Sequence, residues 1–245
     1  MIRRFFYALI TRCNSIRDYK LPFLFLYFGT ETMLKVKIRL SKRKKVPVFY
    51  ILDSSYLPHK AVAFLLRARR MGVIEEKDDC VIVEYSRVRL KLLKQHAVEF
   101  IKYWEVWRKC YLPKFSLEGK TVLDVGAGCG ETAMLFFMHG AEKVVAVEPD
   151  SKAVECLREN IERNKWNVEV IPECFSLEHL KLQFDYMKMD CEGCEEMLLH
   201  IPELNKPSVI EVHKNDLLRQ FEGRGWKKIC SPTNDIHIIS NERDK

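Results

Sequence analysis

The sequence lacks an apolar run long enough to cross a membrane. Its longest strongly apolar stretch, residues 21–28, falls well short of the ~20 residues that a membrane-spanning helix requires, and Pro22 interrupts it. Residues 1–10 also lack the apolar length and the small-residue cleavage site of a secretory signal. These absences predict a globular protein of the cytoplasm.

The cysteines lack the arrangement of a zinc site or a disulfide framework. Cys191 and Cys194 form a Cys-x-x-Cys pair, but no second such pair and no paired histidines follow at the spacing of a structural zinc site. The nine cysteines are an odd number, scattered from Cys13 to Cys230, which is typical of reduced thiols in a cytoplasmic protein. We therefore expect no bound metal, with a redox role for the pair as the alternative.

Charge is divided unevenly along the chain. Residues 1–118 contain 25 lysines and arginines against 11 acidic residues, whereas residues 119–245 contain 16 against 23. A basic half of this kind indicates a surface for a polyanion, a membrane face or an anionic substrate. A solvated basic face that packs against the acidic half fits the charges equally well.

The second half of the chain follows the pattern of an α/β domain, predicted over residues 111–245. Apolar runs alternate with helical patterns, and most of the runs are too uniformly apolar for a sheet with a solvated face, which indicates parallel strands. Asp150 is positioned to cap a helix after the second run. The five predicted parallel strands are 121–125, 144–147, 168–171, 184–189 and 208–212, and segments 225–230 and 236–239 predict a closing antiparallel hairpin.

The first half, predicted as an α+β extension over residues 1–110, follows another rhythm. Helices are predicted at 1–28, 61–71 and 93–109, and strands at 33–40, 46–52, 80–84 and 88–92. The basic run at 42–45 is predicted as a loop between two strands. In the last helix, Ala97, Ile101, Trp104 and Trp107 recur at helical spacing, so we expect them in the core and not on a ligand platform. We expect this extension to select the substrate or to cover the site.

A glycine-rich loop joins the first parallel strand to the following helix. Gly126, Gly128 and Gly130 let the backbone approach a ligand closely. The spacing differs from the G-x-G-x-x-G of dinucleotide-binding loops, and Glu131 would repel a phosphate at the helix start. A cofactor without phosphates fits better, and S-adenosylmethionine is such a cofactor.

Acidic strand ends supply the remaining contacts that this cofactor needs. Asp124 can attract its ammonium group, directly or through water, while loop amides such as that of Ala127 meet its carboxylate. Glu148, followed by Pro149, ends the second strand, where an acidic residue can accept hydrogen bonds from both ribose hydroxyls. Glu173, after the third strand, is predicted to receive the adenine amino group, with an exposed loop acid as the alternative.

Taken together, the segments VLDVGAGCGETA, VVAVEPD, FDYMKMDCEGCEEMLL and VIEVH resemble the FkbM-type methyltransferases, a branch of the class I S-adenosylmethionine-dependent enzymes. The resemblance extends over residues 121–226. It implies a Rossmann-like fold with a seven-stranded, mostly parallel sheet and an antiparallel C-terminal hairpin. It also implies cofactor contacts from Asp124, Gly126, Gly128 and Glu148. Cysteines at 191 and 194 depart from the small or β-branched apolar residues common in that family.

Candidate catalytic residues follow the fourth and fifth strands. Asp190 and Glu192 come after the fourth strand, and Glu211 and His213 lie at the end of the fifth, where strand ends border the ligand crevice. We predict that Asp190 and Glu192 orient acceptor and cofactor and that His213 is the base, since its reference pKa lies near 6.5. A hydrogen-bonded, non-catalytic histidine is the alternative. A variant places a divalent cation between Asp190 and Glu211.

These residues predict O-methylation of a hydroxyl on a small molecule or a glycan. One alternative is an RNA methyltransferase, acting for example on tRNA, that tracks phosphates with its basic first half. Another is a non-catalytic module that binds nucleic acid, or a membrane surface through Arg3, Arg4 and residues 21–28.

Overall fold

The computed structural model describes residues 33–39, 47–53, 72–77 and 79–242. Strands β1 (Met33–Arg39) and β2 (Pro47–Asp53) pair as an antiparallel hairpin, which confirms the strands predicted at 33–40 and 46–52. The helices predicted at 1–28 and 61–71, and the basic run at 42–45, lie outside the described residues.

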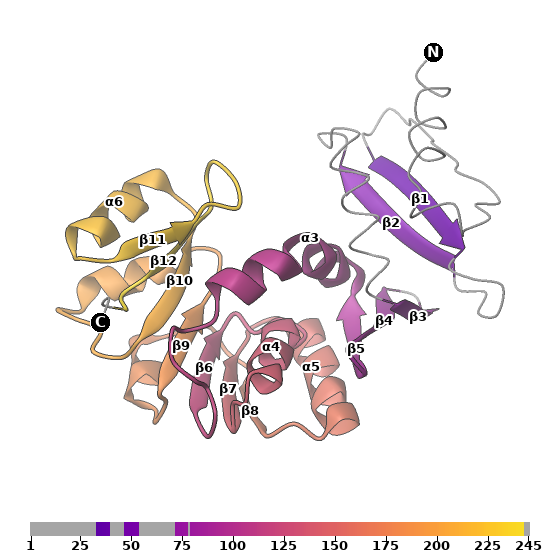
Figure 1. The fold of residues 1–245 in the computed structure, drawn as a ribbon, viewed down its shortest axis with the longest axis horizontal. Helices are drawn as coiled ribbons and strands as arrows, with labels where there is room; N and C mark the ends of the chain where they lie inside the picture. Colours follow the sequence, from indigo (N-terminus) through magenta and orange to yellow (C-terminus); the bar gives the residue numbers. More distant parts are fainter. Residues whose placement is uncertain (1–32, 40–46, 54–71, 78, 243–245) are drawn as a thin grey trace, which may run out of the picture.

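A seven-stranded sheet forms the centre of the α/β part, in the order β11-β12-β10-β9-β6-β7-β8 (Figure 1). Its five parallel strands are β6 (Thr121–Val125), β7 (Lys143–Val147), β8 (Val168–Ile171), β9 (Tyr186–Met189) and β10 (Ser208–Val212). The closing hairpin consists of β11 (Lys227–Cys230) and β12 (His237–Ser240), and β12 runs antiparallel to β10. The mostly parallel sheet with an antiparallel C-terminal hairpin is therefore confirmed.

Most residues of the inner strands are apolar because side chains on both faces of the sheet are buried there. Val122 and Val144 belong to one apolar cluster, whereas the adjacent residues Leu123 and Val145 belong to a second cluster. The helices that follow the strands are α4 (Glu131–Met138), α5 (Ser151–Asn164), α6 (Asn215–Gly223) and two 3-10 segments, η2 (Leu177–Lys181) and η3 (Cys194–His200). Asp150 caps α5 as predicted, accepting hydrogen bonds from the backbone of Lys152 and Ala153.

The segment before the sheet shares its core. Strands β3 (Gly72–Lys77), β4 (Cys80–Tyr85) and β5 (Val88–Leu93) form an antiparallel sheet, which confirms the predicted hairpin, and helix α3 (Lys94–Cys110) follows. Leu90, Phe100 and Trp104 are fully or almost fully buried in the same cluster as Val122 and Val144. The domain boundary predicted between residues 110 and 111 thus divides one continuous apolar core.

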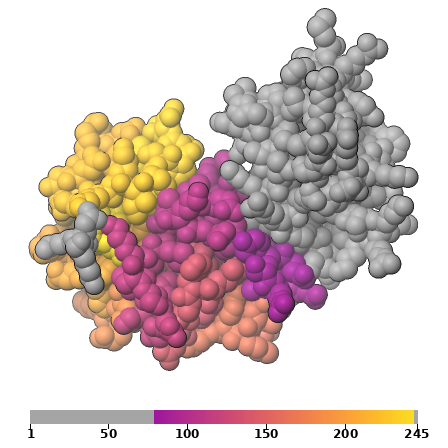
Figure 2. Space-filling view, viewed as in Figure 1, coloured from indigo at the N-terminus to yellow at the C-terminus, as the bar shows by residue number. Residues whose placement is uncertain are grey.

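Helix α3 lies between the antiparallel sheet that precedes it and the C-terminal hairpin. Its surface lies beside that of the C-terminal hairpin in the space-filling view (Figure 2), and the Sγ atoms of Cys110 and Cys230 approach to 2.6 Å. Asn160 of α5 accepts a hydrogen bond from the amide of Lys91 and donates to the carbonyls of Lys91 and Cys129. Of the helices that the structure describes, none is both long and apolar enough to span a bilayer.

Candidate functional site

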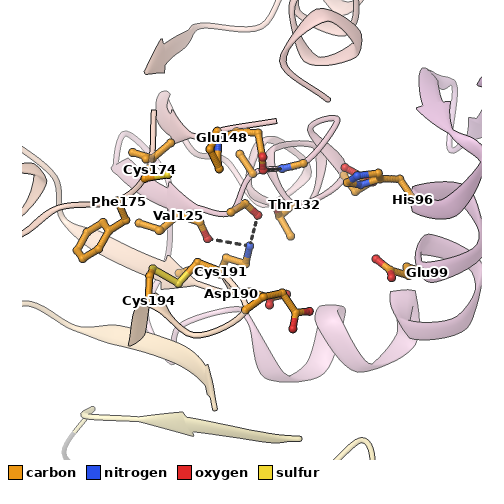
Figure 3. Close-up of a pocket in the computed structure, with 18 of the residues that line it drawn as sticks. His96, Glu99, Val125, Thr132, Glu148, Cys174, Phe175, Asp190, Cys191 and Cys194 are labelled. Atoms are coloured by element: carbon orange, nitrogen blue, oxygen red, sulfur yellow. Dashed lines mark hydrogen bonds and ion pairs between the residues drawn. A yellow bond between two sulfur atoms is a disulfide. The ribbon is translucent and has the colours of Figure 1, made fainter. Parts of the chain in front are cut away.

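A cavity of about 370 Å³ lies at the carboxyl ends of β6, β7 and β9, bordered by α3 (Figure 3). Seven residues predicted to act at the site line it, namely Gly126, Ala127, Gly128, Glu148, Pro149, Asp190 and Glu192. Asp124, Gly130, Glu173 and His213, also predicted to act there, do not line it. The cavity is also lined by residues that the sequence did not single out as ligand contacts, among them His96, Glu99, Trp107, Thr132, Phe175 and Lys188.

The glycines of the loop lie close to neighbouring parts of the protein, which leaves little space for side chains at these positions. Gly126 has a φ of +72°, and a Cβ atom there would lie 1.7 Å from the carbonyl oxygen of Asp190. Gly128 faces the ring of His96, and Gly130 faces Leu157, at 2.9 and 2.8 Å from the position of a Cβ atom. Packing within the protein already requires glycine at residue 126, while the predicted close approach of a ligand to the loop stays a prediction.

Glu148 is held rigidly at the edge of the loop. One carboxylate oxygen accepts a hydrogen bond from the amide of Gly128 at 2.8 Å, and the other accepts one from the amide of Asp150 at 2.9 Å. The side chain still lines the cavity. Because each carboxylate oxygen can accept more than one hydrogen bond, both retain capacity for a diol.

Asp124 lies beneath the loop, and not on the cavity wall. It is fully buried and accepts a hydrogen bond from the hydroxyl of Thr132, and the Nζ atom of Lys188 lies 3.1 Å from its Oδ1. Lys188 also donates to the carbonyl of Gly126 at 2.8 Å. Burial opposes the charge of Lys188, but Asp124 and Asp190 outweigh it and raise its pKa, so the amine is a cation that ties β9 to the loop. The predicted contact of Asp124 with a cofactor ammonium stays a prediction.

The loop after β8 differs from the expectation at Glu173. This residue is exposed, and its carboxylate lies 3.0 Å from Nε2 of His179, on η2. The adjacent residues Cys174 and Phe175 line the cavity instead (Figure 3). Glu173 therefore matches the alternative prediction, an exposed acidic residue of a loop. The ring of Phe175 lies in the cavity wall where the contact with adenine was predicted.

Next to Asp190 of the cavity wall, Tyr111 lies between two carboxyl groups. Its hydroxyl contacts the carboxylate of Glu211 closely and lies 3.0 Å from Oδ2 of Asp190. A phenol has one hydrogen and can donate to only one of them. Tyr111 donates to Glu211, the nearer of the two, while burial and the charge of Asp190 raise the pKa of Glu211.

His213 lies behind this group, surrounded by carboxylates. Its Nδ1 is 3.3 Å from Glu195, and its Nε2 is 3.4 Å from Glu192, 3.5 Å from Glu211 and 3.9 Å from Asp190. Burial opposes the charged ring, but hydrogen bonds with Glu195 and Glu211 outweigh it and raise the pKa of His213 to about 10. A ring that is already protonated at neutral pH cannot accept a proton, so this environment argues against the predicted base role.

The divalent-cation variant finds limited support in the same group. Asp190, Glu192 and His213 each place one potential ligand atom within 4.8 Å of the others. A cation would have to displace the proton of a strongly basic imidazole before that ring could coordinate it. Glu211, the predicted second ligand, is in contact with Tyr111.

Cys191 and Cys194 form a disulfide, so the prediction of reduced thiols is wrong for this pair. The chain turns sharply after β9, with φ values of +54° at Glu192 and +122° at Gly193, and this turn brings the two Cα atoms to 5.5 Å. The remaining cysteines of the described residues are free. The disulfide fixes the loop that carries Glu192 at the cavity wall.

Helix α3 provides three cavity residues that the sequence analysis missed. Trp107 was predicted in the core, but it is only partly buried, lines the cavity and stacks on Tyr111 with an interplanar angle of 13°. His96 and Glu99 reach the cavity from the same helix (Figure 3). Residues 96, 99, 103 and 107 are separated by three, four and four positions, so they lie on one face of the helix, adjacent to the apolar face. This spacing is the pattern in the sequence that could have identified them.

His96 connects α3 to the glycine loop. Its Nδ1 lies 2.9 Å from the carboxylate of Glu131 at the start of α4. Burial opposes the charged ring, but the hydrogen bond with Glu131 and the nearby charges of Glu131, Glu99 and Glu148 outweigh it and raise the pKa of His96 to about 9. Glu131 therefore holds a cationic imidazole here.

Comparison with known proteins adds a family match over part of the chain. The model of the family described as Ribosomal protein L11 methyltransferase (PrmA) matches residues 110–190, which include the glycine loop, Glu148 and Asp190. The Ribosomal protein L11 methyltransferase of Aquifex aeolicus is 37% identical over 117 residues, or 45% of this chain and 46% of the relative. Uncharacterized protein 158B of Sulfolobus islandicus rod-shaped virus 1 is 26% identical over 49% of this chain and 80% of the relative.

Solved structures with similar folds include two from Methanocaldococcus jannaschii. Trm5 in complex with adenosine has a TM-score of 0.49 and 17% identity, covering 80% of this chain and 70% of that chain. TYW2 in complex with AdoMet has a TM-score of 0.46 and 18% identity, covering 69% and 87%. This chain spans less than half the length of the Aquifex relative.

Proposed function

We propose that this class I S-adenosylmethionine-dependent methyltransferase acts on a hydroxyl oxygen of a small molecule or a glycan, as the FkbM-type resemblance predicts. The family match shows the enzyme class and its cofactor, whereas the acceptor and the subfamily are our inference. The observation that carries the proposal is Asp190, a carboxylate on the cavity wall whose Oδ2 lies 3.0 Å from the Tyr111 hydroxyl.

The cofactor supplies an activated methyl group on a sulfonium, so the protein has to bind, align and exclude water. The residues that would hold it are the loop amides of 126–128, Glu148 at the ribose and Phe175 beside the adenine. The Lys188–Asp124 pair would position the loop from below, because Lys188 donates to the carbonyl of Gly126.

When bound, the cofactor would supply its methyl group to the acceptor oxygen and leave as the neutral thioether. Asp190 would receive the hydroxyl proton. We assign the base role to Asp190 in place of His213, since the raised pKa of His213 keeps that ring protonated. His213 then stabilises the neighbouring carboxylates by its charge.

Replacement of Asp190 by Asn tests this assignment. General-base catalysis is typically worth about 10² to 10⁴ in rate, so we expect methyl incorporation from labelled cofactor into a cell extract to fall by at least ~100-fold. Calorimetry should show cofactor affinity within about threefold of wild type, since the proposed cofactor contacts are untouched. The control is Asp216→Asn on the exposed surface of α6, which should leave incorporation unchanged. Full activity of Asp190→Asn would refute the base role.

An RNA acceptor remains the second candidate because residues 1–118 carry a large excess of positive charge. Label that ribonuclease releases from the extract would favour this candidate. Failure of calorimetry to detect cofactor binding would instead favour a non-catalytic module. The cytoplasmic location that we propose is favoured by six free cysteines among the described residues and opposed by the Cys191–Cys194 disulfide.

A further inference from the structure

We propose that the acceptor carries a protonated amine close to the hydroxyl that is methylated. The inference rests on the proposed function and names the chemical class of the acceptor. Its basis is an excess of carboxylates on the cavity wall, together with an aromatic face that these carboxylates surround.

The cations of the cavity are already paired with other groups. Five carboxylates line it, those of Glu99, Glu131, Glu148, Asp190 and Glu192, against the side chains of His96 and Lys188. His96 lies 2.9 Å from Glu131, and Lys188 lies 3.1 Å from Asp124, which is fully buried behind the wall. Two cations against five carboxylates leave the cavity wall with an excess of negative charge.

Three of the five carboxylates, those of Glu99, Asp190 and Glu192, have no proposed contact with the cofactor. Glu99 projects from α3, while Asp190 and Glu192 project from the loop after β9 (Figure 3 shows Glu99 and Asp190). Glu99 has no ion-pair partner within the described part of the chain, and the single imidazolium of His213 is shared between Glu192, Glu195, Glu211 and Asp190. The cofactor adds a net charge of only about one, because its carboxylate offsets its ammonium. An acceptor that brought no positive charge would leave this wall uncompensated.

An aromatic surface completes a site for an ammonium group. The indole of Trp107 lines the cavity and stacks on Tyr111, so one of its faces is supported by protein. Tryptophan is the strongest cation–π partner among the side chains, and carboxylates beside an aromatic face are the usual way to recognise an alkylammonium. Trp107 and Glu99 both come from α3, and they line the same cavity as the carboxylates of the loop after β9. The same wall would repel a phosphate, which makes an RNA acceptor the opposing prediction.

The first test identifies the charge of the product. Wild-type protein is incubated with methyl-labelled S-adenosylmethionine and a small-molecule cell extract, and the label is separated on a cation exchanger at pH 7. After the unreacted donor is identified by a parallel incubation without protein and subtracted, we expect a further labelled species that is retained and that loses retention after N-acetylation, because the methyl group sits on oxygen and leaves the amine free to react. Label in neutral or anionic fractions would overturn the inference while leaving the proposed function intact. Absence of any labelled product would contradict the proposed function itself.

The second test uses matched variants with the retained fraction as acceptor. We expect Glu99→Gln to raise the KM for this acceptor about tenfold or more, with cofactor affinity within twofold by calorimetry. Glu105→Gln, which removes a carboxylate of α3 that pairs with Arg108, is the control and should change neither value. Equal effects of the two variants, or a Glu99→Gln effect confined to cofactor affinity, would refute the assignment.

Discussion

The His96 side chain is a titratable contact between α3 and the glycine loop, and its charge state sets a pH dependence. The pKa of His96 is raised to about 9 in the folded protein, against about 6.5 when unfolded. A group with a raised pKa contributes stability that is fully present below the unfolded pKa and lost as pH rises through the folded one. We expect His96→Gln to lower the free energy of unfolding by ~2 kcal/mol at pH 6 and by much less at pH 10.

Urea unfolding of the two proteins between pH 6 and pH 10 measures this difference. His213 has a raised pKa as well, but it titrates in both proteins and cancels in the comparison. A difference between wild type and variant that stays constant with pH would mean that His96 acts by packing alone.

Single residues were predicted from the sequence where a strand end determined their position. Glu148 and Asp190 line the cavity because each follows an apolar strand of a parallel sheet, and that pattern is readable. Trp107 packs against the core as predicted but also lines the cavity, because periodicity cannot separate two adjacent helix faces. The charge of His213 depends on four carboxylates, and three of them, those of Asp190, Glu192 and Glu195, follow β9 and not β10, so the charge could not be predicted from the residues next to His213.

At the scale of elements, the turn between β6 and α4 depends on its contact with the loop after β9. We expect Gly126→Ala to abolish cofactor binding or to destabilise the protein by at least ~4 kcal/mol, because the added Cβ meets the Asp190 carbonyl at 1.7 Å. Gly193→Ala is the matched control: Gly193 also has a positive φ, of +122°, but nothing lies within 4 Å of its Cβ position. It should cost only the ~1–2 kcal/mol of backbone strain.

Thermal unfolding and calorimetry with the cofactor distinguish the two variants. Equal losses would show that positive φ, and not the close approach of two loops, is what requires glycine at residue 126.

The elements themselves were well predicted, because mostly apolar runs such as 121–125 and 208–212 form buried parallel strands. The fourth strand was predicted to start at residue 184 but begins at Tyr186. Just before it, the side chain of Asp185 accepts a hydrogen bond from the backbone amide of Thr121.

At the scale of the whole molecule, α3 and β4–β5 belong to the same folding unit as the central sheet. Leu90, Phe100 and Trp104 share a core with Val122, and Asn160 hydrogen-bonds both β5 and the glycine loop. We expect a fragment of residues 79–245 to unfold cooperatively on heating, as followed by circular dichroism. A fragment of residues 111–245 should show no cooperative transition, because it leaves one face of this core open.

A cooperative transition for residues 111–245 with a melting temperature near that of the longer fragment would instead support the predicted boundary after residue 110. Composition could not settle this organisation, since the change in net charge near residue 118 lies close to that boundary while the apolar core continues across it. The distribution of charge along the chain describes the surface of the protein, whereas a domain boundary depends on how the apolar side chains pack.

The placement of α3 also bears on how the site can change over time. The glycine loop, Glu148 and the Lys188–Asp124 pair all belong to the sheet and its turns, whereas His96, Glu99 and Trp107 belong to one helix. A few substitutions along that helix would therefore change which acceptor the enzyme methylates. The residues proposed to hold the methyl donor would stay the same. Diversification in this lineage should accordingly concentrate in residues 94–110.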